Sequence, residues 1–333
     1  MLSGSHRSML ATAVVLILCL LAAGCSRQRG AQTSPGAAPG TARAQVIAVE
    51  TFLADMTRQV AGDRAEVRAL IPAGVEPHGY EPTPQDIAAV AEARLLIVNG
   101  AGLESFLSKL LSTAGKSRAI AEASSGIPNR KAREGEAVED AGAPAGAPAD
   151  VDPHFWLDPL LAVKYVENIR DALAAMDPAE TAAYQANAEA YIGKLRELDR
   201  WIAGQVAAIP PADRLLVTNH ESLGYFADRY GFRIIGTIIP SVSAEAAPTA
   251  RQLARLIDVL RAAGAKAVFL ETGASAQLAQ QVAREAGVAV VEELYTHALS
   301  DASGPAPTYI AMMEHDVKTI VAALTSRPSE AAR

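Results

Sequence analysis

Along the chain from residue 45, short hydrophobic segments alternate with longer segments in which hydrophobic residues recur every three or four positions. The short segments are rich in Val, Ile and Leu and end at a polar residue, a glycine or a proline, as buried strands do. We therefore predict strands at residues 45–51, 65–71, 95–99, 117–122, 214–218, 232–239, 267–271 and 288–293.

The longer segments show the period of an amphipathic helix. In the segment 103–114, for example, one face would carry Leu103, Phe106, Leu107, Leu110 and Leu111. Further helices of this kind are predicted at residues 54–61, 84–93, 249–263, 275–286 and 308–325. Strands that alternate with helices of this length predict an α/β fold, in which helices cover both faces of parallel sheets.

A long helical region without strands separates the two strand–helix sets. Its first helix is predicted at residues 159–176. Asp177 and Pro178 then provide a cap and a first-turn proline for a second helix at 179–208. With a rise of 1.5 Å per residue, this second helix would be about 45 Å long and could connect two lobes. A rigid connector of this kind leads us to expect little hinge motion between the lobes.

The N-terminus has the features of an exported lipoprotein. Arg7 precedes an apolar run at residues 9–23 that is too short to cross a bilayer comfortably. Small residues then lead to Cys25, which resembles the lipobox of bacterial lipoproteins, where the cysteine is acylated and becomes the mature N-terminus. A plain secretory signal is the alternative. Residues 26–44 are rich in Gly, Pro, Ala, Ser and Thr and are expected to form a flexible tether.

The predicted organisation follows from these segments. We expect a signal peptide at residues 1–25, a tether at 26–44, an N-terminal lobe at 45–176, a linking helix at 177–209 and a C-terminal lobe at 210–333. Within the N-terminal lobe, residues 129–150 are charged and then rich in Ala, Gly and Pro. This composition predicts a mobile, solvated insertion.

Composition limits the partners and metal ligands that the chain can have. A chain of 333 residues is long enough for two packed lobes, and its net charge of −7 argues against a nucleic-acid partner. The two cysteines are Cys19, inside the predicted signal, and Cys25, the predicted lipid attachment site. The mature chain would then contain no thiol, which excludes disulfides and cysteine-ligated zinc. Any metal ion must be bound by nitrogen and oxygen.

Histidines occupy comparable positions in four loops. His78, His220 and His297 each follow a predicted strand, and His154 precedes a predicted helix. Ligands of open parallel sheets bind beyond the carboxyl ends of the strands, so these side chains are expected to meet in a cleft between the lobes. A single loop histidine is more often structural than a metal ligand. Four together favour a metal site, because neutral imidazole is a common zinc ligand.

The segments around these histidines resemble those of the solute-binding proteins of bacterial zinc and manganese ABC importers. The motifs are Pro77-His-Gly-Tyr-Glu-Pro-Thr-Pro84, Asp152-Pro-His-Phe-Trp-Leu-Asp-Pro159, Thr218-Asn-His-Glu-Ser-Leu-Gly-Tyr-Phe226 and Thr308-Tyr-Ile-Ala-Met-Met313. The resemblance extends from about residue 45 to 323. It implies two lobes, each a small parallel sheet with helices, joined by one long rigid helix, with the metal ion in the cleft.

The resemblance also implies a ligand set of His78, His154, His220 and one further residue. The family usually has an aspartate after Tyr-Thr, where this chain has His297. We predict His297 as the fourth ligand, with Asp301 or a water molecule as the alternatives. An imidazole in place of a carboxylate removes a hard oxygen ligand and favours zinc over manganese. Some zinc members of the family have a histidine- and acid-rich loop where this chain has the insertion. The insertion lacks histidine but has five acidic residues, so weak metal capture is the alternative to a solvated linker.

The predicted function is the capture of Zn²⁺ outside the cytoplasm and its delivery to an ABC permease and its ATPase. The protein would be a monomer, attached to the cell membrane through the lipid on Cys25. A manganese or iron protein of the same importer class is the alternative, and an added adhesin role stays open. A protein for a siderophore or haem would need a cleft lined with aromatic and arginine side chains.

A zinc-dependent hydrolase is the distant alternative, with Glu221 beside His220 as its base. This segment lacks the second histidine of a His-Glu-x-x-His helix, and a fourth histidine ligand would close the site to water. We therefore predict that the protein is not an enzyme.

Overall fold

The computed structural model describes residues 43–115, 118–130, 151–239 and 248–326. The predicted signal peptide, Cys25 and nearly all of the tether lie outside the described residues, as do residues 131–150 of the predicted insertion. None of the described helices is both long enough and apolar enough to span a membrane.

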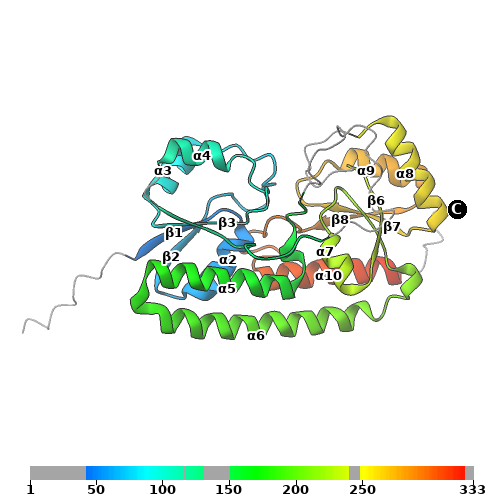
Figure 1. Cartoon of the computed structure of the whole chain (residues 1–333). Helices are drawn as coiled ribbons and strands as arrows, with labels where there is room; N and C mark the ends of the chain where they lie inside the picture. Colours follow the sequence, from blue (N-terminus) through cyan, green and yellow to red (C-terminus); the bar gives the residue numbers. More distant parts are fainter. Residues whose placement is uncertain (1–42, 116–117, 131–150, 240–247, 327–333) are drawn as a thin grey trace, which may run out of the picture. The chain divides into compact units, whose positions relative to one another are not determined.

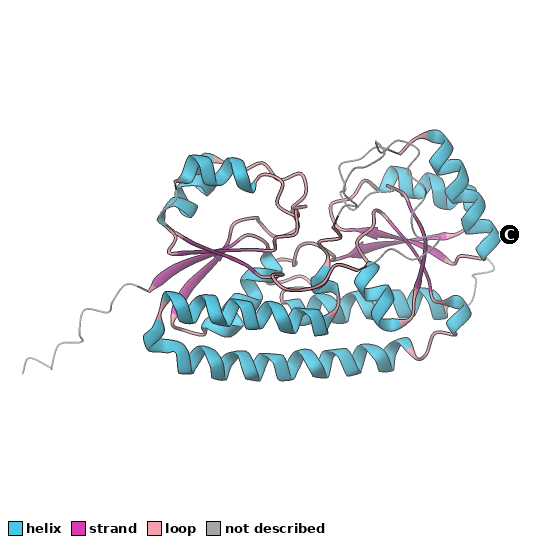
Figure 2. Ribbon diagram, in the orientation of Figure 1, coloured by secondary structure: helices cyan, strands magenta, loops and turns pink. Residues whose placement is uncertain are grey.

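The first four strands form one parallel sheet (Figure 2). The strands are β1 (Ala44–Ala48), β2 (Ala65–Ala69), β3 (Leu95–Val98) and β4 (Ala119–Glu122), in the order β2-β1-β3-β4. The helices of this part are α2 (Thr51–Ala61), α3 (Pro84–Glu92) and α4 (Leu107–Ala114). The sheet occurs where the hydrophobic segments predicted it.

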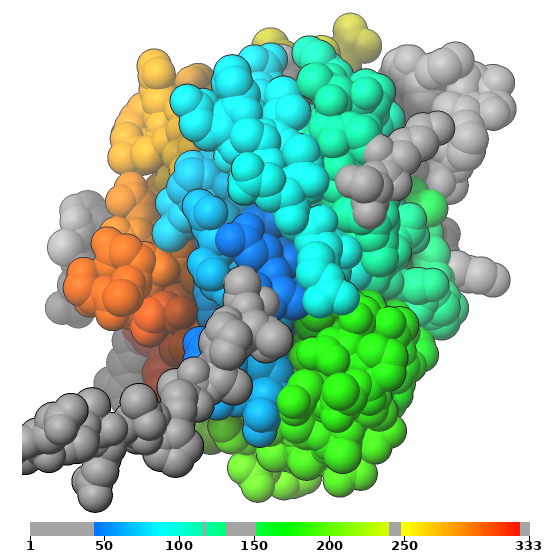
Figure 3. Space-filling view, turned by 90° about the vertical axis from the view of Figure 1, so that its left-hand side faces the viewer, coloured from blue at the N-terminus to red at the C-terminus, as the bar shows by residue number. Residues whose placement is uncertain are grey.

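Helices cover both faces of this sheet, because alternate strand residues point to opposite sides. Ile47 and Leu96 pack into one apolar cluster with side chains of α3 and α4. Val46 and Leu95, their neighbours in the chain, pack into the other cluster, which includes α2 and α5 (Pro159–Met176). In the space-filling view, the α3–α4 segment (cyan) and α5 (green) lie on either side of the β1 segment (blue) (Figure 3).

The last four strands form two parallel pairs instead of one continuous sheet. The pairs are β5 (Leu215–Thr218) with β6 (Arg233–Thr237), and β7 (Ala267–Glu271) with β8 (Ala289–Leu294). Both pairs contain a register irregularity, which bends the strands and interrupts the hydrogen-bond ladder. The helices of this part are α7 (Gly224–Tyr230), α8 (Ala250–Ala263), α9 (Ala276–Ala286) and α10 (Tyr309–Thr325).

The long helix is α6 (Thr181–Val206), which would be about 39 Å long at 1.5 Å per residue. It lies beside α5 and also contacts α2 and α10 (Figure 1). It therefore packs against one helix from the first strand–helix set and one from the second. It begins later than predicted because residues Pro178–Glu180 form a separate 3-10 turn. Helix α5 has the predicted bounds, since Asp158 caps it through the backbone N–H of Leu160.

Several predicted bounds differ from the structure, and helix α4 and the insertion are two examples. Helix α4 begins at Leu107 instead of residue 103, because residues 103–106 form bends and turns in which the Glu104 carboxylate accepts hydrogen bonds from the N–H groups of Asn99 and Gly100. The insertion was predicted to be mobile from residue 129, but its first two residues are bound in the fold. The Tyr225 hydroxyl donates a hydrogen bond to Asn129, and Arg130 forms an ion pair with Asp228 at 3.0 Å.

Candidate metal centre

The four predicted histidines meet in one buried group. His78 lies in the loop after β2, His220 follows β5 and His297 follows β8. His154 directly precedes a 3-10 turn at Phe155–Leu157, which leads into α5. Their exposed fractions are 6%, 0%, 0% and 4%, respectively. One potential ligand atom of each residue lies within 4.8 Å of those of the other three. The structure thus brings together the residues that the sequence analysis named, from loops up to 219 positions apart.

The rings are arranged as a tetrahedron. All six distances between pairs of imidazole centroids lie between 4.9 and 5.5 Å, and four points with nearly equal separations define this shape. The Nε2 atoms of His78 and His154 are 3.3 Å apart, and those of His154 and His297 are 2.9 Å apart. Four nitrogens at 2.0–2.1 Å from a zinc ion would be about 3.3 Å apart. These two nitrogen pairs are therefore close to the spacing that tetrahedral zinc requires.

Oxygen atoms contact the outer ring nitrogen of three of these histidines. Nδ1 of His154 is 2.8 Å from a carboxylate oxygen of Asp152. Nδ1 of His220 is 3.0 Å from Glu271, and Nδ1 of His297 is 2.7 Å from the Thr296 hydroxyl. Such partners select the ring tautomer that leaves Nε2 free for a metal ion. Among the described residues, the buried Nε2 of His220 has no hydrogen-bond partner, as expected for a metal-binding atom.

Glu271 is the central support of this group, and the sequence analysis missed it. It is the last residue of β7 and is 4% exposed. Its carboxylate accepts hydrogen bonds from the hydroxyls of Ser222 at 2.9 Å and Thr296 at 2.8 Å, besides its contact with His220. The rule that ligand-binding residues follow the carboxyl ends of strands would have found it, because the strand at 267–271 was predicted correctly.

A second acidic residue, Glu76, was also missed, although it lies two positions before His78. One of its carboxylate oxygens is 3.9 Å from Nε2 of His78, and the other is 3.6 Å from Nδ1 of His297. Its side chain is 28% exposed. Glu76 therefore lies beside the histidine group and also reaches solvent.

Burial and neighbouring charges set the protonation of the group. Burial lowers the pKa of His78 to about 3, with contributions from His297 and His220, and burial likewise holds the pKa of His154 well below its ordinary value. Burial acts to lower the pKa of His220 as well, but Glu271 outweighs it, so that this pKa is raised. Burial acts to raise the pKa of Glu271, but His220 more than offsets it and holds the pKa well below its ordinary value. At neutral pH, His78 and His154 are therefore neutral imidazoles, whereas His220 is paired with the ionised carboxylate of Glu271.

Trp156 connects the segments of two of the histidines. Its ring centroid is 5.2 Å from that of His154 and 5.8 Å from that of His297. Its indole N–H donates a hydrogen bond of 2.8 Å to the carbonyl of Thr296, and its ring stacks on Phe52. The motif that carries His154 is thereby held against the loop that carries His297.

Asp301, the competing fourth ligand, does not join the histidine group. Its side chain is exposed, and its carboxylate accepts hydrogen bonds from the backbone N–H and the hydroxyl of Ser303. His315 lies on α10, with Nε2 3.2 Å from the carbonyl of Glu293, and is also outside the group. In the described structure, His297 lies with the other three histidines and Asp301 does not.

Two cavities flank the histidine group. One has a volume of about 260 Å³ and is lined by Glu76, Asn219 and Glu271 among others; we call it the Glu76 cavity. The other has a volume of about 340 Å³ and is lined by His78, Tyr80 and Lys109 among others; we call it the Tyr80 cavity.

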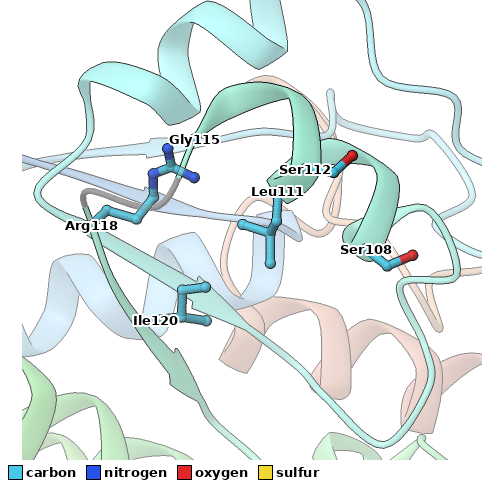
Figure 4. Close-up of a pocket in the computed structure, with 6 residues that line it drawn as sticks. All are labelled: Ser108, Leu111, Ser112, Gly115, Arg118 and Ile120. Atoms are coloured by element: carbon cyan, nitrogen blue, oxygen red, sulfur yellow. The ribbon is translucent and has the colours of Figure 1, made fainter.

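A larger cavity of about 420 Å³ lies at α4 and β4 (Figure 4). No histidine or carboxylate is among its lining residues, which are Ser108, Leu111, Ser112, Gly115, Arg118 and Ile120. Arg118 donates a hydrogen bond to the carbonyl of Ala114 at the end of α4. This cavity therefore has no donor set for a metal cation.

Comparisons with known proteins show the family to which this chain belongs. Residues 46–323 match the family described as the periplasmic component A of the zinc-uptake complex. The chain belongs to this family. The manganese-binding lipoprotein MntA of Halalkalibacterium halodurans is 35% identical over 312 residues, which are 94% of this chain and 97% of that protein. The iron-binding protein YfeA of Yersinia pestis is 34% identical over 276 residues, or 83% of this chain and 85% of that protein.

A solved structure supports the fold. The periplasmic zinc-binding protein TroA from Treponema pallidum has a TM-score of 0.75 at 26% sequence identity, covering 85% of this chain and 100% of that chain. The predicted α/β fold with parallel sheets flanked by helices is confirmed. The chain is an extracytoplasmic metal-binding component of an ABC importer, whose partners are a permease and its ATPase. The family consists of solute-binding proteins, which confirms the prediction that the chain is not an enzyme.

Proposed function

We propose that this chain captures Zn²⁺ with the imidazoles of His78, His154, His220 and His297 and delivers it to an ABC permease. The near-equal spacing of the four rings carries this proposal, because it matches a tetrahedral, fully protein-ligated zinc site. His78, His154 and His220 lie in the motifs that resemble those of the importer family. His297 lies in the loop where that family usually has an aspartate after Tyr-Thr.

Nitrogen ligands favour zinc over manganese. Imidazole suits zinc, copper and iron, whereas manganese is usually bound by carboxylates, carbonyls and water. The carboxylate of Glu271 faces hydroxyl and N–H groups of the protein and acts as a support for the ligands. The relatives named above bind manganese and iron as well as zinc, so the donor set of this chain is the basis for choosing zinc.

The proposal places the protein on the cell membrane as a lipoprotein monomer. Cys25 follows an apolar run and small residues, and MntA, which aligns over 94% of this chain, is itself named a lipoprotein. A lipid on Cys25 would keep the metal-binding part near the permease. Residues 26–44 would form the tether, α6 the rigid link between an N-terminal and a C-terminal lobe, and the acidic insertion a solvated linker.

The test is calorimetric titration of the metal-free mature protein with zinc, together with elemental analysis. We expect one zinc ion per chain. His297→Ala and His154→Ala should both weaken zinc binding by more than the roughly 10–100-fold typical of outer contacts. Asp301→Ala is the matched control and should bind as tightly as the wild type. Tight binding by His297→Ala with loss in Asp301→Ala would refute the ligand set. Preferential binding of manganese over zinc would refute the choice of metal.

A further inference from the structure

We propose that the Glu76 cavity is the loading site for the metal ion and that Glu76 is the first protein group to bind the hydrated divalent cation. The ion would then pass to the four imidazoles. This inference rests on the proposed zinc function and adds to it an access route and a first ligand.

The lining of the Glu76 cavity suits a cation. It includes the carboxylates of Glu76 and Glu271, and no lysine or arginine is among its described lining residues. Asn219 also lines the cavity and is only 7% exposed. Its side-chain amide adds a polar group to the cavity. Hydroxyls of Thr272 and Ser275 add further polar groups.

Glu76 connects this cavity to the imidazoles. Its partly exposed carboxylate lies within 4 Å of a ring nitrogen of both His78 and His297. The backbone N–H of His78 donates a hydrogen bond of 3.2 Å to one carboxylate oxygen and so orients the group. A cation bound to Glu76 is therefore close enough for imidazole nitrogens to replace its water molecules one at a time. No electron transfer is involved, and the displaced water returns to the cavity.

The Tyr80 cavity is the competing route, because His78 itself lines it. Its lining includes the ammonium group of Lys109 and the apolar side chains of Ile87, Phe106 and Leu110. A positive charge repels a divalent cation, and apolar side chains cannot replace its hydration shell. One exposed carboxylate, that of Glu81, also lines this cavity. The chain thus offers one acidic residue on each side of His78, which makes the two routes separable by mutation.

The experiment compares Glu76→Gln with Glu81→Gln, which makes the same charge change three residues after His78 instead of two residues before it. Zinc association and dissociation rates are measured by rapid mixing of the metal-free protein with zinc and with a fluorescent chelator. Glutamine at position 76 can still accept the hydrogen bond from the His78 N–H, so only the charge is removed. The thermal midpoint of each metal-free variant checks the fold.

We expect Glu76→Gln to lower the association rate constant roughly 3–10-fold, from the loss of one charge near a divalent cation. The dissociation rate should stay within about twofold of the wild type, and the effect should shrink as salt rises to about 1 M. Glu81→Gln should associate at nearly the wild-type rate.

Three results would overturn the loading site. A slow Glu81→Gln with a normal Glu76→Gln would assign the Tyr80 cavity as the route. A faster dissociation of Glu76→Gln with unchanged association would make Glu76 a support of the bound ion instead. An association defect that is equal at low and high salt would remove the charge argument. If the wild-type protein itself bound no zinc, the proposed function would fail first and this inference with it.

Discussion

Replacement of Glu271 by glutamine tests whether an outer carboxylate holds the imidazoles in place. The groups around this carboxylate are donors, namely the hydroxyls of Ser222 and Thr296 and the Nδ1 atom of His220 at 3.0 Å. His297 Nδ1 lies at 3.4 Å. A glutamine supplies one acceptor oxygen and an amide that can only donate. At least one of these donors would lose its acceptor in a site that is 4% exposed.

The magnitude follows from this loss. A buried donor left without a partner costs about 1–3 kcal/mol. Outer-contact mutations in metal sites typically lower affinity by about 10–100-fold, which is about 1.4–2.8 kcal/mol. We therefore expect Glu271→Gln to bind zinc about 10–100-fold more weakly than the wild type. The loss should appear mainly in the dissociation rate, because the displaced imidazoles hold the bound ion less well.

The assay is competition with a zinc chelator of known affinity, with association and dissociation rates measured separately. Glu189→Gln is the matched control, since Glu189 is exposed on α6 and outside the histidine group. Circular dichroism and the thermal midpoint of the metal-free variant show whether it folds. A folded Glu271→Gln protein with wild-type zinc affinity would refute the supporting role. A loss confined to the association rate would assign Glu271 to metal loading instead.

Three further predictions follow from the same site. Because protons compete with zinc for an imidazole, affinity should fall as the pH drops through the raised pKa of His220. His78, with a pKa of about 3, holds no proton to displace at pH 5–7, and burial also holds the pKa of His154 well below its ordinary value. Calorimetry from pH 5 to 7.5 should therefore give a slope well below four protons per zinc ion, and a slope of four or of zero would contradict the scheme. The Cys25→Ser variant should leave the membrane fraction on cell fractionation, and mass spectrometry that finds wild-type Cys25 without a lipid would disprove the anchor. His297→Asp should raise the affinity for manganese relative to zinc, because a carboxylate is the harder ligand; an unchanged ratio in competition titrations would remove the argument from ligand type.

Much of the fold could be predicted from local patterns. Strand β7 and helix α5 have the predicted bounds, because their signals are local: a run of apolar residues ending in Glu271, and a capping Asp158 followed by a proline. The start of α4 could not be predicted in this way. Leu103 has the helical spacing, but residues 103–106 form bends and turns, and the Glu104 carboxylate accepts a hydrogen bond from the Gly100 N–H before the helix begins.

For the candidate site too, local sequence patterns predicted some features, and contacts between distant segments decided the others. The positions of the four histidines after strands, or before a helix, were sufficient to predict that they meet, because the carboxyl ends of parallel strands share one edge of a sheet. Their sequence positions carry no information on the spacing of the rings. That spacing depends on contacts between distant segments, such as the hydrogen bond from Trp156 to Thr296.

Only the tertiary structure revealed the roles of Glu271 and Glu76. In the sequence, Glu271 is one of 37 acidic residues, and its place at the end of a predicted strand shows neither that it is buried nor which histidine it contacts. Folding places it against His220 and buries both, and this burial makes their opposite charges stabilise each other. The sequence by itself determined which side chains can bind a metal ion. The tertiary structure decided their tautomers, their charges and the side from which an ion can reach them, because each of these depends on residues distant in the chain.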